Sequence, residues 1–185
     1  MSRVKPGALQ TRPKNPRFLT LNDEVIILAY RWRTRLWLDD SLLRLIRLMP
    51  QLSRSALYRC LERYGLSKMG RTNISPPLTS VSLAGPFRFE ITVDHVDLGD
   101  LVVPVLLVVE EVTKLAYGEM VEATPENTVA FLAPLVAEFP QKIDAVTTDI
   151  CPAFTHVREA FGEYMRDIGP PPCAARCRPG HLSRW

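Results

Sequence analysis

Two segments that end in polar residues constrain the fold of this chain more than any other feature of the sequence. Residues 87–96 alternate apolar and polar side chains, which is the period of a half-buried β-strand. The apolar face is Phe89, Ile91 and Val93, and the polar face is Glu90, Thr92 and Asp94. Residues 143–148 predict a short parallel strand that ends at Asp149. Because chemistry in open α/β sheets gathers beyond strand ends, Asp149 and the polar face supply candidate site residues.

Two more strands and a helix lie between these segments, and a second helix follows them. Residues 101–109 are almost continuously apolar, as is typical of a central strand, and residues 114–121 predict a third strand. Thr124 and Pro125 predict the start of a helix that buries Val129, Leu132, Ala133 and Val136. A further helix over residues 152–167 is expected to bury Phe154, Val157, Phe161 and Tyr164. The second half therefore predicts an α/β fold in the order β-β-β-α-β-α.

Charge is divided sharply along the chain. Residues 1–72 carry 15 Lys and Arg against 5 Asp and Glu, a net charge of +10, whereas residues 73–169 carry 5 against 15, a net charge of −10. A basic block of this size is the electrostatic footprint of phosphate-backbone binding, with a solvated basic surface as the alternative. The acidic half suits a metal-dependent domain or a merely soluble one.

The basic block predicts three helices with apolar residues at i, i+3, i+4 and i+7. Asn22, Asp39 and Ser53 are the predicted N-caps, and Pro50 and Gly65 are expected to end the second and third helices. The residues expected in the core are Val25, Leu28, Ala29 and Trp32, then Leu42, Leu45, Ile46 and Met49, then Leu57, Cys60, Leu61 and Tyr64.

The short connection between Met49 and Ser53 predicts a helix-turn-helix whose third helix contacts DNA. The residues expected to reach phosphates and base edges from its outer face are Arg54, Ser55, Arg59 and Arg63. A plain three-helix bundle with a solvated basic face is the alternative.

Several stretches together resemble one family over residues 12–169. Residues 13–17 are Pro-Lys-Asn-Pro-Arg, and residues 52–67 are Leu-Ser-Arg-Ser-Ala-Leu-Tyr-Arg-Cys-Leu-Glu-Arg-Tyr-Gly-Leu-Ser. Residues 89–92 are Phe-Glu-Ile-Thr, and residues 145–149 are Ala-Val-Thr-Thr-Asp, with Phe-Thr at 154–155. These stretches resemble the insertion-sequence transposases of the integrase-core (DDE) superfamily. The resemblance implies a ribonuclease-H-like core that cuts and joins DNA with Mg²⁺ or Mn²⁺ held by three carboxylates.

The sequence departs from the catalytic set of that family. Thr92 stands where the family has its first Asp, and Asp94, two residues on, faces the same side of the strand. Asp149 matches the second Asp, but Ile150 and Cys151 replace the Asn-Gly that follows it, and the segment with the third carboxylate has no match. Two-metal phosphoryl transfer needs the carboxylates jointly. We therefore expect no strand transfer and no productively bound metal, with Asp149 and Asp94 as the remaining candidate ligands.

Five regions are expected along the chain: a basic arm at 1–19, a helix-turn-helix unit at 20–66, a linker at 67–86, a partial integrase core at 87–169 and a disordered tail at 170–185. The tail has no acidic residue and no apolar period, which is typical of an out-of-frame reading of GC-rich DNA. The chain thus resembles an internal piece of a transposase. A zinc site in the tail would lack a fourth ligand beside Cys173, Cys177 and His181.

Functions from different classes follow from these features. The first is a transposase-like DNA-recombination protein that is an inactive remnant. The second is a DNA-binding module that occupies element ends or competes with an intact transposase, and a residual nuclease using Asp94 and Asp149 is a third. DNA is the expected partner, with self-association or an intact transposase as further partners. Without an apolar signal segment or a bilayer-spanning run, we expect a cytoplasmic protein with no membrane contact.

Overall fold

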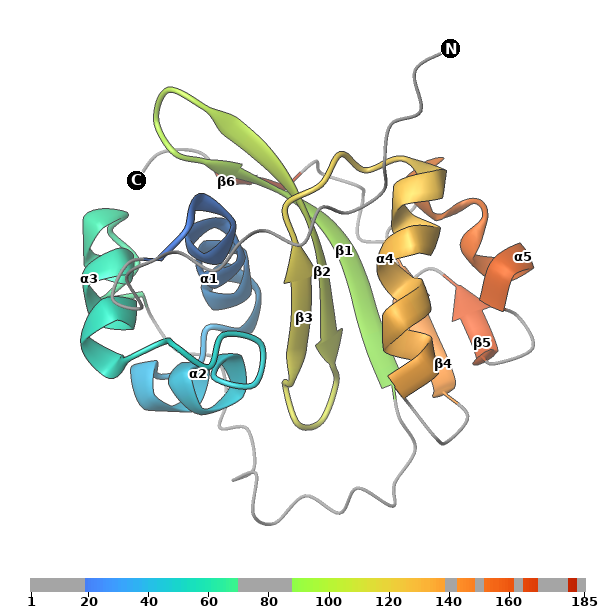
Figure 1. Cartoon of the computed structure of the whole chain (residues 1–185), viewed down its shortest axis with the longest axis horizontal. Helices are drawn as coiled ribbons and strands as arrows, with labels where there is room; N and C mark the ends of the chain where they lie inside the picture. Colours follow the sequence, from blue (N-terminus) through green and yellow to red (C-terminus); the bar gives the residue numbers. More distant parts are fainter. Residues whose placement is uncertain are drawn as a thin grey trace.

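The computed structural model describes residues 19–69, 88–138, 143–148, 152–161, 165–169 and 180–182. Three helices come first: α1 (Leu21–Thr34), α2 (Leu38–Leu45) and α3 (Arg54–Arg63) (Figure 1). The later elements, in chain order, are β1 (Arg88–Asp97), β2 (Val102–Glu110), β3 (Ala116–Glu119), α4 (Pro125–Glu138), β4 (Ile143–Thr148), the 3₁₀ helix η2 (Pro152–Phe154), α5 (Val157–Phe161), β5 (Met165–Gly169) and β6 (Gly180–Leu182). Within these residues, no helix combines the length and apolar character needed to cross a membrane.

Six strands form one mixed sheet in the order β3-β2-β1-β4-β5, and β6 pairs beside β1. β1, β2 and β3 are antiparallel neighbours, whereas β4 and β6 run parallel to β1, and β5 runs parallel to β4. α4 connects the antiparallel part to β4. An antiparallel meander extended by parallel strands is consistent with a partial ribonuclease-H-like core. The predicted α/β class and the parallel direction of β4 are therefore confirmed.

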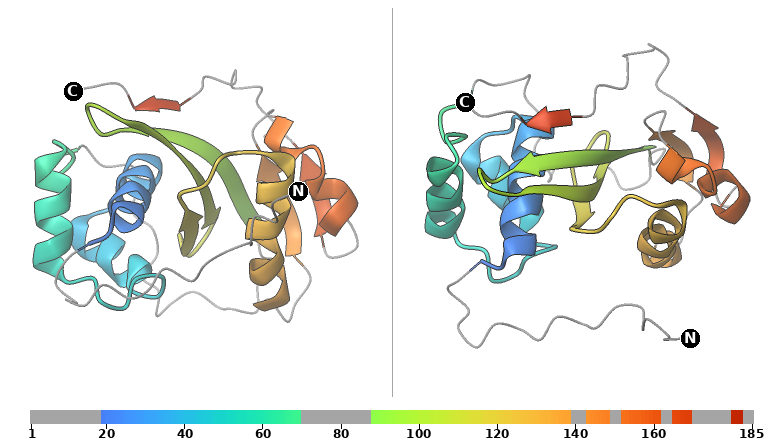
Figure 2. Two further views of the ribbon diagram at one scale, coloured as in Figure 1. Left: turned by 45° about the horizontal axis from the view of Figure 1, so that its top comes forward. Right: turned by 90° about the horizontal axis from the view of Figure 1, so that it is seen from above.

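The two faces of β1 meet different layers, as the alternating pattern predicts. Phe89 and Ile91 are buried in a hydrophobic cluster with α4, η2 and α5, whereas Val96 belongs to a second cluster with α1, α2 and α3. Figures 1 and 2 show the sheet between the helices α1–α3 and the helix α4. β2 is an interior strand that is covered by both layers, with the fully buried residues Val105, Leu106, Leu107 and Val108.

α1 packs directly on the sheet. Residues 25–31 are buried without interruption, so this helix is covered on all sides. A Cβ at Gly118 of β3 would lie 3.0 Å from Cγ2 of Ile26, and glycine therefore permits the close approach of strand and helix. Asn22 accepts a hydrogen bond from the backbone amide of Met120 at 2.8 Å and ties the start of the helix to the end of β3.

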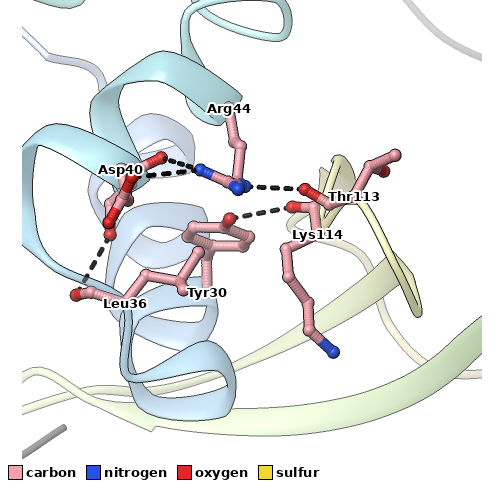
Figure 3. Close-up of polar contacts among 7 residues, drawn as sticks. Tyr30, Leu36, Asp40, Arg44, Thr113 and Lys114 are labelled. Carbon is pink, nitrogen blue, oxygen red and sulfur yellow. Dashed lines mark hydrogen bonds and ion pairs between the residues drawn. The ribbon is translucent and has the colours of Figure 1, made fainter. Parts of the chain in front are cut away.

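Two buried side chains of the helices hold the turn between β2 and β3 (Figure 3). The hydroxyl of Tyr30 donates to the carbonyl of Lys114 at 2.8 Å, and Nε of Arg44 donates to the carbonyl of Thr113 at 2.6 Å. Nη1 of Arg44 also donates to the carbonyl of Asp40 at 3.1 Å and lies 3.5 Å from its carboxylate. Tyr30 is 0% and Arg44 1% exposed, and burial raises the pKa of Tyr30 above its usual range. The helical layer is thus fixed to the hairpin by buried polar groups.

The same turn is also held from within. The carboxylate of Glu110 accepts hydrogen bonds from the amide and the hydroxyl of Thr113 and from the amide of Val112. Lys114 then adopts a left-handed conformation with φ 59°, which directs its carbonyl to Tyr30. The buried carboxylate of Glu110 is thus satisfied by three donors within the turn itself.

The starts of α1 and α2 differ from the predictions. Thr20 caps α1 in a capping box with Asp23, so the predicted cap Asn22 is wrong. Trp37 precedes α2 without a side-chain cap, and the predicted cap Asp39 lies within the first turn. Neither side chain caps its helix, because Asn22 accepts a hydrogen bond from the amide of Met120 and Asp39 forms an ion pair with Arg54.

The prediction for α3 is confirmed at both ends, whereas α2 is shorter than predicted. The hydroxyl of Ser53 accepts from the amide of Ala56, and Gly65 follows α3 with φ 72°. α2 ends at Leu45, so the connection to α3 is longer than the predicted tight corner. Ile46, expected in the core, is 41% exposed. The half-buried side chains among the other predicted core residues are Trp32, Leu42 and Tyr64.

The helix predicted over residues 152–167 is wrong in its second part. Phe154 and Val157 are buried in η2 and α5, but residues 165–169 form β5 on the free edge of β4. Backbone pairing at an open sheet edge overrides the local helical period. In α4, the predicted core residue Ala133 is exposed because the buried face runs through Leu132, Leu135 and Val136.

Part of the predicted tail is ordered. Residues 180–182, for which disorder is expected, form β6 beside residues 94–96 of β1. The remainder of the tail with Cys173 and Cys177, the arm through residue 18, residues 70–86 of the predicted linker and residue 87 lie outside the described residues.

Tyr30→Phe is expected to lower the free energy of unfolding by about 1–2 kcal/mol, because the carbonyl of Lys114 loses its buried donor. Chemical denaturation of the full chain measures the change. The matched control is Tyr58→Phe, since the hydroxyl of Tyr58 contacts Glu62 at an exposed position, and the expected change is below about 0.5 kcal/mol. Equal effects of both substitutions would contradict the role assigned to the buried hydroxyl.

Candidate functional site

The polar face of β1 carries the predicted catalytic positions Thr92 and Asp94, and both are 2% exposed. The Asp94 carboxylate accepts hydrogen bonds from Nη2 of Arg33 at 2.9 Å and from the hydroxyl of Thr92 at 3.1 Å. Arg33 comes from α1, because the helix lies across this face of the sheet. The buried carboxylate therefore already has a cation and a neutral donor as partners.

Glu90 lies at the more open end of the same face. Its carboxylate is 3.7 Å from Nη1 of Arg33, and its side chain is 45% exposed. The guanidinium of Arg33 thus lies between the carboxylates of Glu90 and Asp94. A metal ion at Asp94 would have to displace Arg33, the charged hydrogen-bond donor that this carboxylate already has.

The end of β4 approaches the candidate site from the neighbouring strand. Thr148 is the Cα partner of Ile91, one residue before Thr92. Asp149 lies outside the described residues, so the meeting of Asp94 and Asp149 stays a prediction. Among the residues that the structure describes, no group of three or more His, Cys, Asp or Glu could hold a metal ion.

The second candidate site is the outer face of α3. Leu57, Cys60 and Leu61 bury one side of this helix in the cluster with α1 and α2. The exposed side presents all four predicted DNA-contacting residues, Arg54, Ser55, Arg59 and Arg63. Their predicted exposure is confirmed, and their contact with DNA stays a prediction.

Two of these arginines pair with carboxylates of neighbouring helices. Nε of Arg54 is 2.6 Å from Asp39 of α2, and Nη1 of Arg63 is 2.6 Å from Glu24 of α1. The hydrogen bond from Arg54 lowers the pKa of Asp39, and the hydrogen bond to Glu24 raises the pKa of Arg63. Arg54 and Asp39 are both more than half exposed, and a surface pair of this kind contributes little to stability. Glu24 is half-buried and keeps the hydroxyl of Tyr64 as a second donor when Arg63 leaves it. A phosphate can therefore replace the carboxylates at low cost.

Arg59 differs from its neighbours on α3. Its Nε donates to the carbonyl of Ser55 at 3.2 Å, and no carboxylate among the described residues pairs with it. The nearby acid Glu62 accepts instead from the hydroxyl of Tyr58 at 3.0 Å. Among the arginines of this face, Arg59 can therefore bind a phosphate without first breaking an ion pair with a carboxylate of the described residues.

Arg33 is the residue of the first site that the sequence analysis did not identify. It is 61 residues away from Asp94 in the chain, and it belongs to a helix that the sequence assigns to a separate unit. Only the docking of α1 on the sheet brings the two charges together. No local pattern in the sequence indicates this contact.

Comparisons with known proteins give a distant similarity of fold. No protein-family model and no curated protein matches the chain. A solved structure that it resembles is the cryo-electron-microscopy structure of the simian T-cell lymphotropic virus intasome in complex with the PP2A regulatory subunit B56 gamma. The TM-score is 0.42 at 10% sequence identity, and the alignment covers 80% of this chain and 53% of the other. The chain spans about half the length of that neighbour.

Arg33→Met is expected to lower the free energy of unfolding by about 1–3 kcal/mol, because the buried Asp94 carboxylate loses its charged donor. In an Asp94→Asn background the same substitution should cost much less, which a double-mutant cycle by chemical denaturation measures. Glu90→Gln is the matched control, since Glu90 is more distant and more exposed. Additive effects of the two substitutions would show that Arg33 does not hold Asp94.

Proposed function

We propose that this chain is a DNA-binding protein of the transposase and integrase type that contacts duplex DNA through α3 and does not itself cut or join strands. The observation that carries the proposal is the exposed face of α3, where Arg54, Arg59 and Arg63 lie together. This face belongs to a segment with a net charge of +10 over residues 1–72. Clustered guanidinium groups on one helix are the expected footprint of phosphate contacts.

The position of α3 supports this role. α1 lies between α3 and the sheet, so α3 forms the outer edge of the helical layer (Figure 2). A ten-residue helix with one buried and one exposed side can approach the major groove without rearrangement of the core. Ser55, exposed between the arginines, adds a hydroxyl donor for phosphate oxygens.

The binding mode follows from the ion pairs of the free protein. Arg59 contacts phosphate directly, whereas Arg54 and Arg63 exchange Asp39 and Glu24 for phosphates of the DNA. These exchanges release counterions from the DNA, so the affinity depends steeply on salt. Contacts of this kind position the protein on the duplex and carry little sequence information.

The polar face of β1 supports the part of the proposal that this chain does not cut or join DNA strands. Thr92 offers a neutral hydroxyl where a carboxylate would hold a metal ion, and Asp94 is buried and bound by Arg33. The other carboxylates of the described polar face of β1, those of Glu90 and Asp94, both pair with Arg33, which leaves Asp149 as the remaining candidate ligand. Mg²⁺ or Mn²⁺ therefore belongs to the intact relatives and is not held productively by this chain.

The cellular setting that we propose is the cytoplasm, with DNA as the partner. An intact transposase or a second copy of this chain is a further partner. A DNA-binding-only protein would occupy the ends of an element or compete with an active enzyme for them.

Replacing both Arg59 and Arg63 by Ala should weaken duplex binding and reduce the slope of log K against log salt by about 2, about one for each lost phosphate contact. Fluorescence anisotropy with a labelled duplex across a salt series measures both quantities. Arg88→Ala is the control, because Arg88 is an exposed arginine at the start of β1, away from α3. Asp39→Asn should raise the affinity, since it frees Arg54.

An unchanged salt slope in the Arg59→Ala/Arg63→Ala variant would overturn the assignment of α3 as the contact helix. Equal losses in that variant and in Arg88→Ala would indicate binding by net charge alone.

The purified chain is expected to leave nicked and linear DNA intact in Mg²⁺ and in Mn²⁺. The reason is that Thr92 supplies no carboxylate and the carboxylate of Asp94 is already paired with Arg33 of α1. Gel analysis of the substrates after long incubation measures cleavage and strand joining. Turnover that Asp149→Ala or Asp94→Ala abolishes would contradict the proposal and favour the nuclease alternative.

A further inference from the structure

A pocket of about 600 Å³ opens between the end of α1, the start of α2, α3 and residues 67–69. Its lining includes three cations and two aromatic rings: Arg31, Arg54, Lys68, Trp37 and Tyr58. Ser55, Arg59 and Arg63 are not among the lining residues, and Arg54 is the residue that the pocket shares with the arginines of the outer face of α3. A volume of this size lies within the range of small-molecule sites, roughly 300–1,000 Å³.

The charge of the lining favours an anion. Asp39 is the one acidic residue of the lining, and it is engaged by Arg54 at 2.6 Å. Arg31 and Lys68 therefore contribute positive charge that no acid of the lining offsets. Lys68 is exposed and can move toward a ligand, whereas Arg31 is held in place.

Arg31 is a buried cation whose environment is incomplete. It is 5% exposed, and its Nε and Nη2 donate to the carbonyls of Leu66 and Met69, both at 3.4 Å. Nη1 has no hydrogen-bond partner among the described residues. Burial lowers the pKa of Arg31, and no carboxylate counteracts this effect. Nη1 is itself enclosed by protein, and a buried charge is costly unless it is paired. An anion in the pocket that Arg31 lines would therefore offset this charge by proximity, without contact to Nη1.

The aromatic rings supply a second kind of contact. Trp37 is 47% exposed and Tyr58 is 42% exposed, although both are large apolar side chains. Partly exposed rings beside cations are the elements with which proteins bind single nucleotides and single strands, since every base offers a flat π-face. A ligand that satisfies the whole lining therefore carries both an anion and a planar ring.

We propose that this pocket binds a nucleotide, with its phosphate at Arg31 and Lys68 and its base against Trp37 or Tyr58. The source of the nucleotide is either a free mononucleotide or an unpaired position of a DNA strand, because both present the same phosphate and base. A base inside an intact duplex is stacked and cannot enter. The proposal does not require that the outer face of α3 binds duplex DNA.

Calorimetric titration of the full chain with dAMP, with inorganic phosphate and with a short single strand of deoxyadenosine tests the proposal. We expect dAMP to bind more tightly than phosphate. Trp37→Ala or Tyr58→Ala should weaken dAMP about tenfold, the effect of removing one stacked ring, and leave phosphate unchanged. Lys68→Gln should weaken all three ligands. Thermal unfolding confirms that each variant is folded.

Arg88→Ala is the matched control, because Arg88 is an exposed arginine outside the pocket and its replacement should leave dAMP binding unchanged. Tighter binding of the single strand than of dAMP would assign the pocket to DNA strands, and equal binding would assign it to free nucleotides. Equal affinities for dAMP and phosphate, with no effect of either aromatic substitution, would overturn the proposal in favour of a simple anion site. Absence of binding by all three ligands would overturn it completely.

Loss of duplex binding in the anisotropy experiment, with dAMP binding intact, would reject the function proposed for α3 and leave the pocket standing. Loss of dAMP binding with a normal salt slope on duplex DNA would reject the pocket alone. The two proposals therefore fail separately.

Discussion

The structure depends on two hydrogen bonds, one buried and one partly buried, that fix the helical layer to the β2–β3 turn. The carbonyls of Thr113 and Lys114 point out of the sheet, where no strand can satisfy them, and Arg44 and Tyr30 supply the donors. A buried carbonyl without a partner costs about 1–3 kcal/mol, so these contacts select one position of α1 and α2 over its alternatives. Apolar packing between α1 and the sheet adds stability, whereas the polar contacts set the register of one layer against the other.

This register decides the chemistry of both candidate sites. With α1 across the sheet, Arg33 reaches Asp94 and neutralises the carboxylate that a metal ion would need. The same placement buries α1 and leaves α3 at the outside, with its arginines exposed. The position of α1 therefore pairs the buried Asp94 of β1 with Arg33 and leaves the outer face of α3 exposed. This division fits binding without strand chemistry.

The sequence predicts those features that depend on local periodicity. The alternation in β1, the apolar run of β2 and the cap Ser53 all determine the structure within a few residues, and each prediction is confirmed. The features that the sequence does not predict depend on distant partners. Asn22 bonds to Met120 across 98 residues, residues 165–169 pair with β4, and Arg33 meets Asp94 across 61. The candidate site is the part of the structure that the sequence predicts least well, because a binding or metal site is assembled from segments that are far apart in the chain.

Net charge along the sequence overstates the charge that a partner can meet. Arg44 is 1% exposed and bound to backbone, Arg31 is 5% exposed, and Arg33 lies between two carboxylates. On the surface, Arg54 and Arg63 are paired in the free protein, which leaves Arg59 as the cation of α3 without an acidic partner in the described residues. Some arginines of the basic segment are therefore buried and stabilise the fold, whereas those on the surface of α3 are available to contact a ligand. The burial and pairing of each arginine, and not their number, determine how strongly this face attracts phosphate.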